Sequence, residues 1–199
     1  TEADLDGSDL RSTAFLQPAR DLFRTCGLWS LLEPHSRPLE QLAVIDTTGW
    51  PPVERERRVF ASADVSGEPF GWNLMNWLVR RELWRYLQDA PGITMLYGTG
   101  FKSLVNRTSE VIVGLSDGSS VRAKLAVAAD GKFSPLREAV GIGVTTTRYG
   151  QKSLAFTVTH DLPHENVSTE IYNEGGPFTI VPLPDIDDCP ASAIVWMNK

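Results

Sequence analysis

The sequence predicts an α/β fold with a mixed, largely antiparallel sheet. Two segments in the first half of the chain carry apolar residues at the spacing of an amphipathic helix. After residue 150, four apolar runs follow one another with no helical pattern between them. Strands that succeed one another without intervening helices favour antiparallel pairing. A further apolar run, near the middle of the chain, leads directly into a short helical signal.

The two helical patterns are separated by a region of short strands and long loops. After an expected loop at residues 1–9, the first helix has five apolar residues on one face, and Gly27 is its expected C-cap. Those five are Phe15, Ala19, Leu22, Phe23 and Cys26. The second helix covers residues 79–87, and Asn76 stands where a helix N-cap is favoured. Between the helices, prolines and charges surround short apolar runs at 42–45 and 59–60.

Strand patterns begin at Ile93 and dominate the rest of the chain. Residues 111–115 and 121–127 flank the turn signal Ser116-Asp117-Gly118-Ser119, which predicts a hairpin. Both faces of the second run become apolar beyond Ala126, so we expect that end to be buried on both sides. The four later runs are residues 154–158, 167–172, 178–181 and 193–197.

Composition narrows the functional classes. The net charge of −6 and pI of about 5.1 argue against nucleic-acid binding, which needs a face rich in lysine and arginine. Two widely spaced cysteines indicate free thiols in a reducing compartment. No apolar stretch is long enough for a transmembrane helix, and the acidic N-terminus is unlike a signal peptide, so we expect a cytoplasmic protein. The three histidines lack metal-ligand spacing, so no metal site is expected.

Residues 125–137 are the segment that points most strongly to a binding site. An expected buried strand runs into Asp130-Gly131, and Ser134 then stands as N-cap before Pro135, the first residue of a short helix. Such a junction directs backbone N–H groups outward and forms an anion site. Asp130 could accept hydrogen bonds from sugar hydroxyls, and Gly131 allows a ligand close to the backbone. The alternative is a plain turn, as at Asp117-Gly118.

The string Ala128-Ala129-Asp130-Gly131-Lys132-Phe133-Ser134-Pro135-Leu136-Arg137 resembles the Asp-Gly motif of class A flavoprotein aromatic hydroxylases. Residues 9–14 are similar to that family's Asp-x-Arg-x-x-Ala motif, and residues 71–76 followed by Arg80 are similar to its segment beside the flavin. Later strings follow the order of the ubiquinone-biosynthesis branch, namely Tyr149-Gly150-Gln151, Pro163-His164, Gly176-Pro177-Phe178 and Pro182-Leu183-Pro184. The resemblance covers nearly the whole chain.

The resemblance implies a portion of an FAD/NAD(P)-binding-type flavin domain interleaved with a substrate-domain sheet. Residues 1–60 would hold a flavin-domain helix and the start of the substrate domain, 61–145 the flavin part with the Asp-Gly motif, and 146–199 a truncated substrate-domain sheet. The implied activity is that of an FAD-dependent monooxygenase. It would hydroxylate a polyprenylated phenol in ubiquinone biosynthesis, with NAD(P)H and O2. Since the cofactor carries this chemistry, no catalytic side chain is expected.

By the same resemblance, seven residues would bind the cofactors: Arg11, Asn76, Arg80, Asp130, Gly131, Ser134 and Arg137. For the substrate, Phe178, Ile180 and Pro182 share one face of a strand that the family places below the flavin ring. Each role has a plainer alternative. The arginines could be solvated, Asn76 could be a simple N-cap, and the strand residues could be ordinary core.

The chain departs from the family pattern in two places. It has no Gly-x-Gly-x-x-Gly turn after a first strand, and no later Gly-Asp motif. We therefore expect a fragment that binds FAD weakly or not at all and does not turn over. A contact with the periphery of the inner membrane, or with a ubiquinone-biosynthesis complex, would come from the missing regions. Two alternatives stay open: a flavin hydroxylase of another small aromatic substrate, and a non-catalytic binding module.

Overall fold

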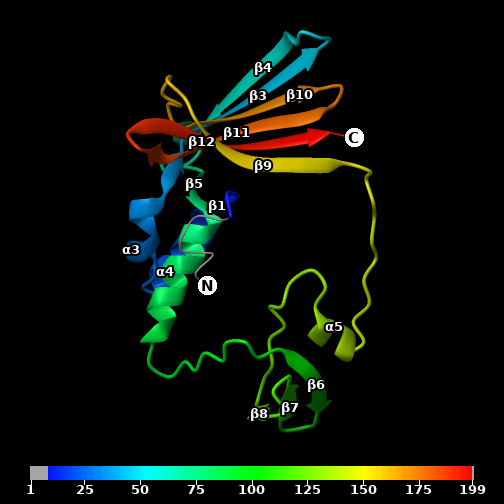
Figure 1. Ribbon diagram of the computed structural model, residues 1–199. Coiled ribbons are helices and arrows are strands. Elements are labelled where there is room, and N and C mark those ends of the chain that lie inside the picture. Colours follow the sequence, from blue (N-terminus) through cyan, green and yellow to red (C-terminus); the bar gives the residue numbers. More distant parts are fainter. Residues whose placement is uncertain (1–8, 199) are drawn as a thin grey trace. The chain divides into compact units, whose positions relative to one another are not determined.

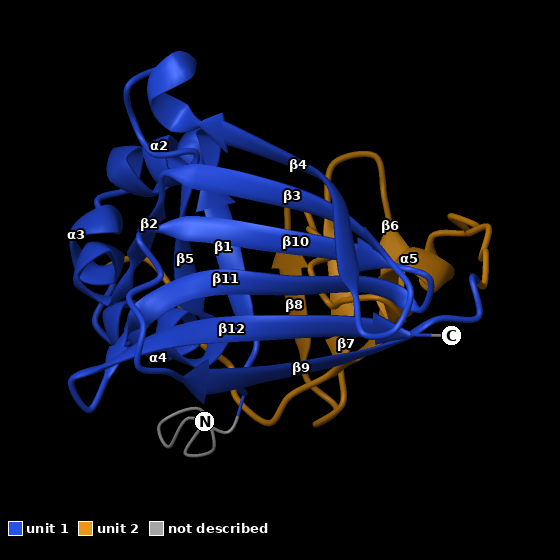
Figure 2. Ribbon diagram, turned by 90° about the horizontal axis from the view of Figure 1, so that it is seen from above, with its two compact units in different colours: residues 1–90, 149–199 blue, residues 91–148 orange. Residues whose placement is uncertain are grey.

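The computed structural model describes residues 9–198, so most of the loop expected at residues 1–9 lies outside the described part. The chain divides into two compact units, which Figure 2 shows in different colours. The described residues up to Ala90 and from Tyr149 onward form the first unit, and Pro91–Arg148 form the second. The three segments expected for the flavin and substrate domains stay a prediction.

A six-stranded sheet dominates the first unit, in the order β4-β3-β10-β11-β12-β9 (Figure 1). Only β10 and β3 pair in parallel, so the expectation of a mixed, largely antiparallel sheet is confirmed. All four strand signals after residue 150 are confirmed as well. The strands are β3 Gln41–Thr48, β4 Val53–Ala61, β9 Lys152–Thr159, β10 Val167–Asn173, β11 Gly176–Ile186 and β12 Cys189–Asn198.

Among its described residues, the same unit also holds a small sheet, in the order β1-β5-β2, and three helices. The strands are β1 Ser12–Leu16, β2 Arg37–Leu39 and β5 Gly71–Met75, and the helices are α2 Gln17–Thr25, α3 Trp29–Leu32 and α4 Asn76–Gln88. Short 3-10 turns cover Glu33–His35 and Ser62–Asp64.

The first helix begins later than its apolar pattern indicates. Phe15 lies on β1, because residues 12–16 pair along their whole length with β5, and α2 then begins at Gln17 with Pro18 in its first turn. Cys26, and not Gly27, is the C-cap of α2. Gly27 follows with φ +71°, a left-handed conformation that favours glycine after a helix end.

The core of the first unit consists of two apolar clusters. One joins Met75 to residues of β11 and β12, with Trp77, Leu78 and Val181 packed against it; its buried members are Met75, Leu183, Ala191 and Ala193. The other lies among α2, α3, α4 and β5, and its buried members are Trp29, Leu32 and Leu74. Buried Asn73 links the two sheets, because its side-chain amide donates a 2.9 Å hydrogen bond to the Pro182 carbonyl.

The second unit is a three-stranded meander with a short helix. Its elements are β6 Phe101–Asn106, β7 Val111–Leu115, β8 Ser120–Ala123 and α5 Pro135–Ala139. The hairpin at Asp117-Gly118 is confirmed: Gly118 has φ +90°, and the Ser119 N–H donates to Asp117 Oδ1 over 2.9 Å. The helix cap is confirmed too, since Ser134 is the N-cap of α5 and Pro135 its first residue.

The expected buried strand before Asp130 is wrong. Strand β8 ends at Ala123, and the residues from Lys124 to Ala129 have no regular structure. Leu125 and Val127 are 75% and 76% exposed. A strand needs a neighbour to accept and donate its backbone hydrogen bonds, and no strand among residues 9–198 pairs with this segment. Ile93 to Tyr97 likewise lie outside any strand, and the first strand of this unit begins at Phe101.

Candidate functional site

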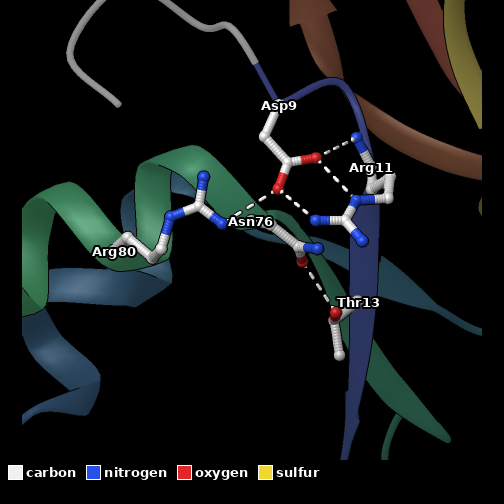
Figure 3. A network of polar contacts seen from close by, with 5 residues as sticks. All are labelled: Asp9, Arg11, Thr13, Asn76 and Arg80. Atoms are coloured by element: carbon white, nitrogen blue, oxygen red, sulfur yellow. Dashed lines mark hydrogen bonds and ion pairs between the residues drawn. The ribbon is translucent and has the colours of Figure 1, made fainter. Parts of the chain in front are cut away.

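Three of the predicted cofactor-binding residues lie together where β1 and α4 begin (Figure 3). The Asp9 carboxylate joins the two arginines of this group. Arg11 Nε and Nη2 each donate to Asp9 over 2.8 Å, and Arg80 Nη1 donates to Asp9 Oδ2 over 2.9 Å. The Arg11 carbonyl accepts a 2.9 Å bond from the Asn76 N–H. The β1–β5 pairing, extended by this bond, brings Arg11 and Asn76 together. We call Asp9, Arg11 and Arg80 the arginine cluster.

The two guanidinium groups of the arginine cluster face solvent, and the Asp9 carboxylate lies between them. The Asp9 side chain is only 13% exposed, whereas those of Arg11 and Arg80 are 66% and 44% exposed. The hydrogen bond from Arg11 holds the pKa of Asp9 far below its usual range, and Arg80 adds to this effect. Exposed guanidinium groups bind phosphates through paired N–H donors, so the cluster suits a pyrophosphate.

Asn76 is not the N-cap of α4, so that part of its expectation is wrong. Met75 occupies the cap position, and Asn76 is the first helical residue. The Asn76 side-chain oxygen accepts a 2.7 Å hydrogen bond from the Thr13 hydroxyl. Its amide NH2 group is therefore the part left to donate to a ligand.

The other four predicted cofactor-binding residues lie together in the second unit. Asp130 Oδ2 accepts from the Leu136 N–H over 3.2 Å, and Ser134 Oγ accepts from the Arg137 N–H over 3.0 Å. The Arg137 guanidinium donates to the Lys132 carbonyl over 3.1 Å. These bonds correct the expectation of outward-facing N–H groups at the helix start, because the capping side chains already satisfy two of them. A hydrogen bond with Ser134 is the main cause of the lowered pKa of Asp130.

A cavity of about 610 Å³ opens beside these four residues. Asp130, Gly131, Ser134 and Arg137 form its polar side, and most of its remaining wall is apolar. Gly131 has φ +90°, and no atom would lie within 4 Å of an added Cβ, so its backbone is open to a ligand. An apolar cavity with a few polar groups on one side is typical of small-molecule sites. The Asp117-Gly118 turn, by contrast, lines none of the described cavities.

The predicted substrate residues share a face, as expected. On β11, Phe178, Ile180 and Pro182 stand opposite Trp196, Ile194 and Ser192 of β12. The rings of Phe178 and Trp196 pack edge to face, with their centroids 6.2 Å apart, and Pro182 is fully buried. Ile180 lines a cavity of about 620 Å³ with His160 and His164. The alternating residues Val181 and Leu183 face the other side, toward Met75. A substrate role for Phe178, Ile180 and Pro182 stays a prediction.

A second apolar cavity lies on the Leu183 side of the sheet, next to the arginine cluster. It measures about 590 Å³, and its wall includes Leu10, Met75, Trp77, Thr157 and Leu183. Leu10 directly precedes Arg11, and its carbonyl accepts a 3.3 Å bond from the Thr157 hydroxyl. Sequence reasoning missed Met75 and Thr157, because pairing between distant strands brings them together. Leu183 and Pro184 of the string Pro182-Leu183-Pro184 also line this cavity.

A hydrolytic site has little support. Ser192 Oγ lies 2.9 Å from His160 Nε2, at the spacing of a nucleophile and its base. Ser192 is 0% exposed, however, so its hydroxyl cannot reach a substrate. The donor set instead suits a flavin dinucleotide. Guanidinium groups would bind its phosphates, and the Asn76 amide would donate a hydrogen bond to the polar edge of its ring or to its sugar chain. The apolar cavity beside Leu10 would hold an aromatic ring.

Within residues 9–198, no helix is long and apolar enough to cross a membrane, and no group of three or more potential ligand side chains could hold a metal ion. Both cysteines, Cys26 and Cys189, are exposed and free.

Comparison with known proteins gives one family and several relatives. A family model described as an FAD binding domain matches residues 4–195. The ubiquinone hydroxylase UbiL of Rhodospirillum rubrum is 35% identical over 97% of this chain and 43% of its own length. The 3-demethoxyubiquinol 3-hydroxylase of Escherichia coli is 25% identical over 96% of this chain and 46% of its own. The chain thus spans less than half the length of these relatives.

Solved structures share the fold at low sequence identity. Pseudomonas aeruginosa PqsL, in complex with 2-aminobenzoylacetate, superposes with a TM-score of 0.77 at 18% identity, over 94% of this chain and 50% of that one. Klebsiella pneumoniae HpxO, in complex with FAD and uric acid, gives 0.74 at 19% identity, over 94% and 46%.

Proposed function

The chain belongs to the FAD binding domain family, and on that premise we propose that it is part of an FAD-dependent aromatic-ring monooxygenase. The substrate we propose is a polyprenylated phenol of ubiquinone biosynthesis, and the co-substrates are NAD(P)H and O2. Similarity to the Rhodospirillum rubrum ubiquinone hydroxylase over 97% of the chain is the observation that carries this proposal. The arginine cluster beside an apolar cavity supports it independently.

When bound, FAD would take reducing equivalents from NAD(P)H and activate O2 for transfer of one oxygen atom to the ring. The chain's own residues bind, orient and shield. Arg11 and Arg80 offer fixed positive charge to phosphates, and the Asn76 amide donates a hydrogen bond. Asp130 would accept hydrogen bonds from hydroxyl groups, while Gly131, Ser134 and Arg137 shape the loop around it.

The apolar cavity beside Leu10 is our choice for the aromatic head group. Met75, Trp77 and Leu183 would exclude water from the reacting ring. Thr157 adds a hydroxyl group to the wall of the cavity. Phe178, Ile180 and Pro182, the substrate residues expected from the sequence, occupy the opposite face, where Ile180 lines another cavity, so a substrate role for them would place part of the substrate on that side of the sheet. A lipid-tailed substrate resides in a bilayer, so we further propose a peripheral membrane contact, from the cytoplasmic side of the inner membrane.

We assign the Asp130 segment to a flavin domain and residues 146–199 to a substrate domain. Because the chain covers 43% of its 35%-identical relative, we propose that residues 1–199 alone bind FAD weakly or not at all and do not turn over.

The test is a chimera. Residues 1–199 would replace the matching region of the Rhodospirillum rubrum hydroxylase. Flavin fluorescence should report FAD binding, and mass spectrometry should find one added oxygen atom on a prenylated phenol in the presence of NADH or NADPH. A matched chimera with Arg11→Met should bind FAD more weakly.

A folded chimera that binds no FAD would overturn the flavin assignment. Binding of FAD with oxygenation of an unprenylated phenol alone would favour a hydroxylase of another small aromatic substrate. Binding with no oxygenation of any phenol would favour the non-catalytic binding module.

A further inference from the structure

We infer that Asp9 is a positioning residue that holds Arg11 and Arg80 as one preformed site for a phosphate or pyrophosphate group. The inference rests on the proposed function, because it concerns how that site receives the anionic part of its cofactor. It adds a residue that binds no ligand itself and acts through two others.

Asp9 has two arginine partners, Arg11 two residues along the chain and Arg80 far from it in sequence. Both oxygens of its carboxylate are used: Oδ1 accepts from Arg11 Nε, while Oδ2 accepts from Arg11 Nη2 and from Arg80 Nη1. The Arg11 backbone N–H also donates to Oδ1, over 3.2 Å. Arg11 precedes β1 and Arg80 lies on α4, so one carboxylate fixes the spacing of two guanidinium groups that the local chain does not connect (Figure 3).

The Asp9 carboxylate and the two guanidinium groups differ in their exposure to solvent. The carboxylate is largely covered, at 13% exposure, whereas both guanidinium side chains reach solvent. An incoming anion therefore meets the arginines and not Asp9. Two long side chains held in place in advance lose less conformational entropy when a ligand binds. That gain must exceed the repulsion between Asp9 and the anion for the carboxylate to help binding.

Two physical effects of Asp9 thus have opposite signs, and a neutral variant separates them. If Asp9 only cancels charge, Asp9→Asn should strengthen anion binding. If Asp9 holds the arginines, Asp9→Asn should weaken anion binding by about tenfold. The loosened arginine side chains would then lose conformational entropy each time the anion binds. Glu56→Gln is the matched control. It removes the same charge on the exposed strand β4, where Glu56 pairs with Arg58, and should leave binding unchanged.

The experiment titrates inorganic pyrophosphate into the 15N-labelled chain and follows the arginine Nε–H resonances by NMR. The Arg11 signal, identified by its loss in Arg11→Lys, should be sharp and slow to exchange in the wild-type chain and broad in Asp9→Asn. Asp9→Glu keeps the charge but moves the carboxylate, and it should also weaken binding. This second variant keeps the test usable if Asp9→Asn fails to fold, which a thermal melt would reveal.

Equal or tighter pyrophosphate binding by a folded Asp9→Asn chain overturns the inference. So does a wild-type Arg11 signal as mobile as that of the variant, or a wild-type chain that leaves pyrophosphate unbound. A parallel FAD titration of the chimera described above tests the proposed function separately. Failure there, with a normal pyrophosphate result, would reject the flavin assignment and leave the role of Asp9 intact.

Discussion

The side-chain oxygen of Asn76 accepts a 2.7 Å hydrogen bond from the hydroxyl of Thr13, and this bond ties the first residue of α4 to strand β1. The contact fixes the direction of an amide that would otherwise rotate freely on the surface. It also distinguishes Asn76 from a simple helix cap, because the oxygen bonds to a neighbouring strand and not to the N–H groups of its own helix.

Thr13→Val should release the Asn76 amide while keeping the shape of the side chain. We expect the free energy of unfolding to fall by about 0.5–1 kcal/mol, since the bond lies near solvent. Urea unfolding measures this loss. If Asn76→Ala lowers the free energy of unfolding by the same amount, and the double variant loses no more, the hydrogen bond is the common cause. Additive losses would show that the two residues act separately.

Asp130→Ala should weaken FAD binding in the chimera by about tenfold or more, the usual cost of losing a hydrogen bond to a charged group. Asp117→Ala is the matched control, because Asp117 also precedes a glycine with φ +90° in the same unit but lines none of the described cavities. Flavin fluorescence titration measures both. Equal effects of the two substitutions would mean that Asp130-Gly131 is only a turn.

Acidification should destabilise the chain through His164. Its Nδ1 accepts from the Asn166 N–H over 3.1 Å, so the proton sits on Nε2, which donates to the Leu183 carbonyl over 3.2 Å. Burial is the main cause that lowers the pKa of His164, and the positive charge of Arg37 adds to it; Asp185 raises this pKa and nearby His160 lowers it. The folded state therefore resists a second proton more than the unfolded state does.

The direction of the pH effect follows from this difference. Above the ordinary pKa of 6.5 both states are neutral at His164. Below pH 6.5 the unfolded state takes up a proton first. The free energy of unfolding therefore decreases as the pH is lowered, until the lower pKa of the folded state is reached. His164→Gln keeps a donor for Leu183 but cannot titrate, and its urea midpoint should fall less between pH 7.5 and 5.5. His35→Gln is the control for loss of any histidine. An unchanged slope in His164→Gln would contradict the prediction.

Leu183→Ala should cost about 2–5 kcal/mol of unfolding free energy, because it opens a cavity in the cluster around Met75. Leu154→Ala makes the same chemical change at an exposed position of the same sheet and should cost under about 1 kcal/mol. Urea unfolding of the two variants gives the comparison. Similar losses would mean that Leu183 lies outside the core.

The sequence alone was sufficient for features set within a few neighbouring residues. Alternation revealed all four strands after residue 150, because successive side chains of a strand point to opposite faces of the sheet. Turn chemistry revealed the Asp117-Gly118 hairpin, and Ser134-Pro135 revealed the start of α5, because caps and turns depend on local backbone bonds. Short motifs also indicated the family. They further indicated most of the residues that the structure gathers into the group around Arg11 and the group around Asp130.

Only the tertiary structure decided features that depend on distant pairing. Phe15 joined a strand because β5 pairs with it, although its spacing fits a helix. Residues 124–129 formed no strand, because an apolar run becomes a strand only when another strand satisfies its backbone groups. The use of Asp9 as a bridge between Arg11 and Arg80, and the cavity shared by Met75, Thr157 and Leu183, required the folded chain. Residues far apart in sequence meet there through sheet register, which no local pattern encodes.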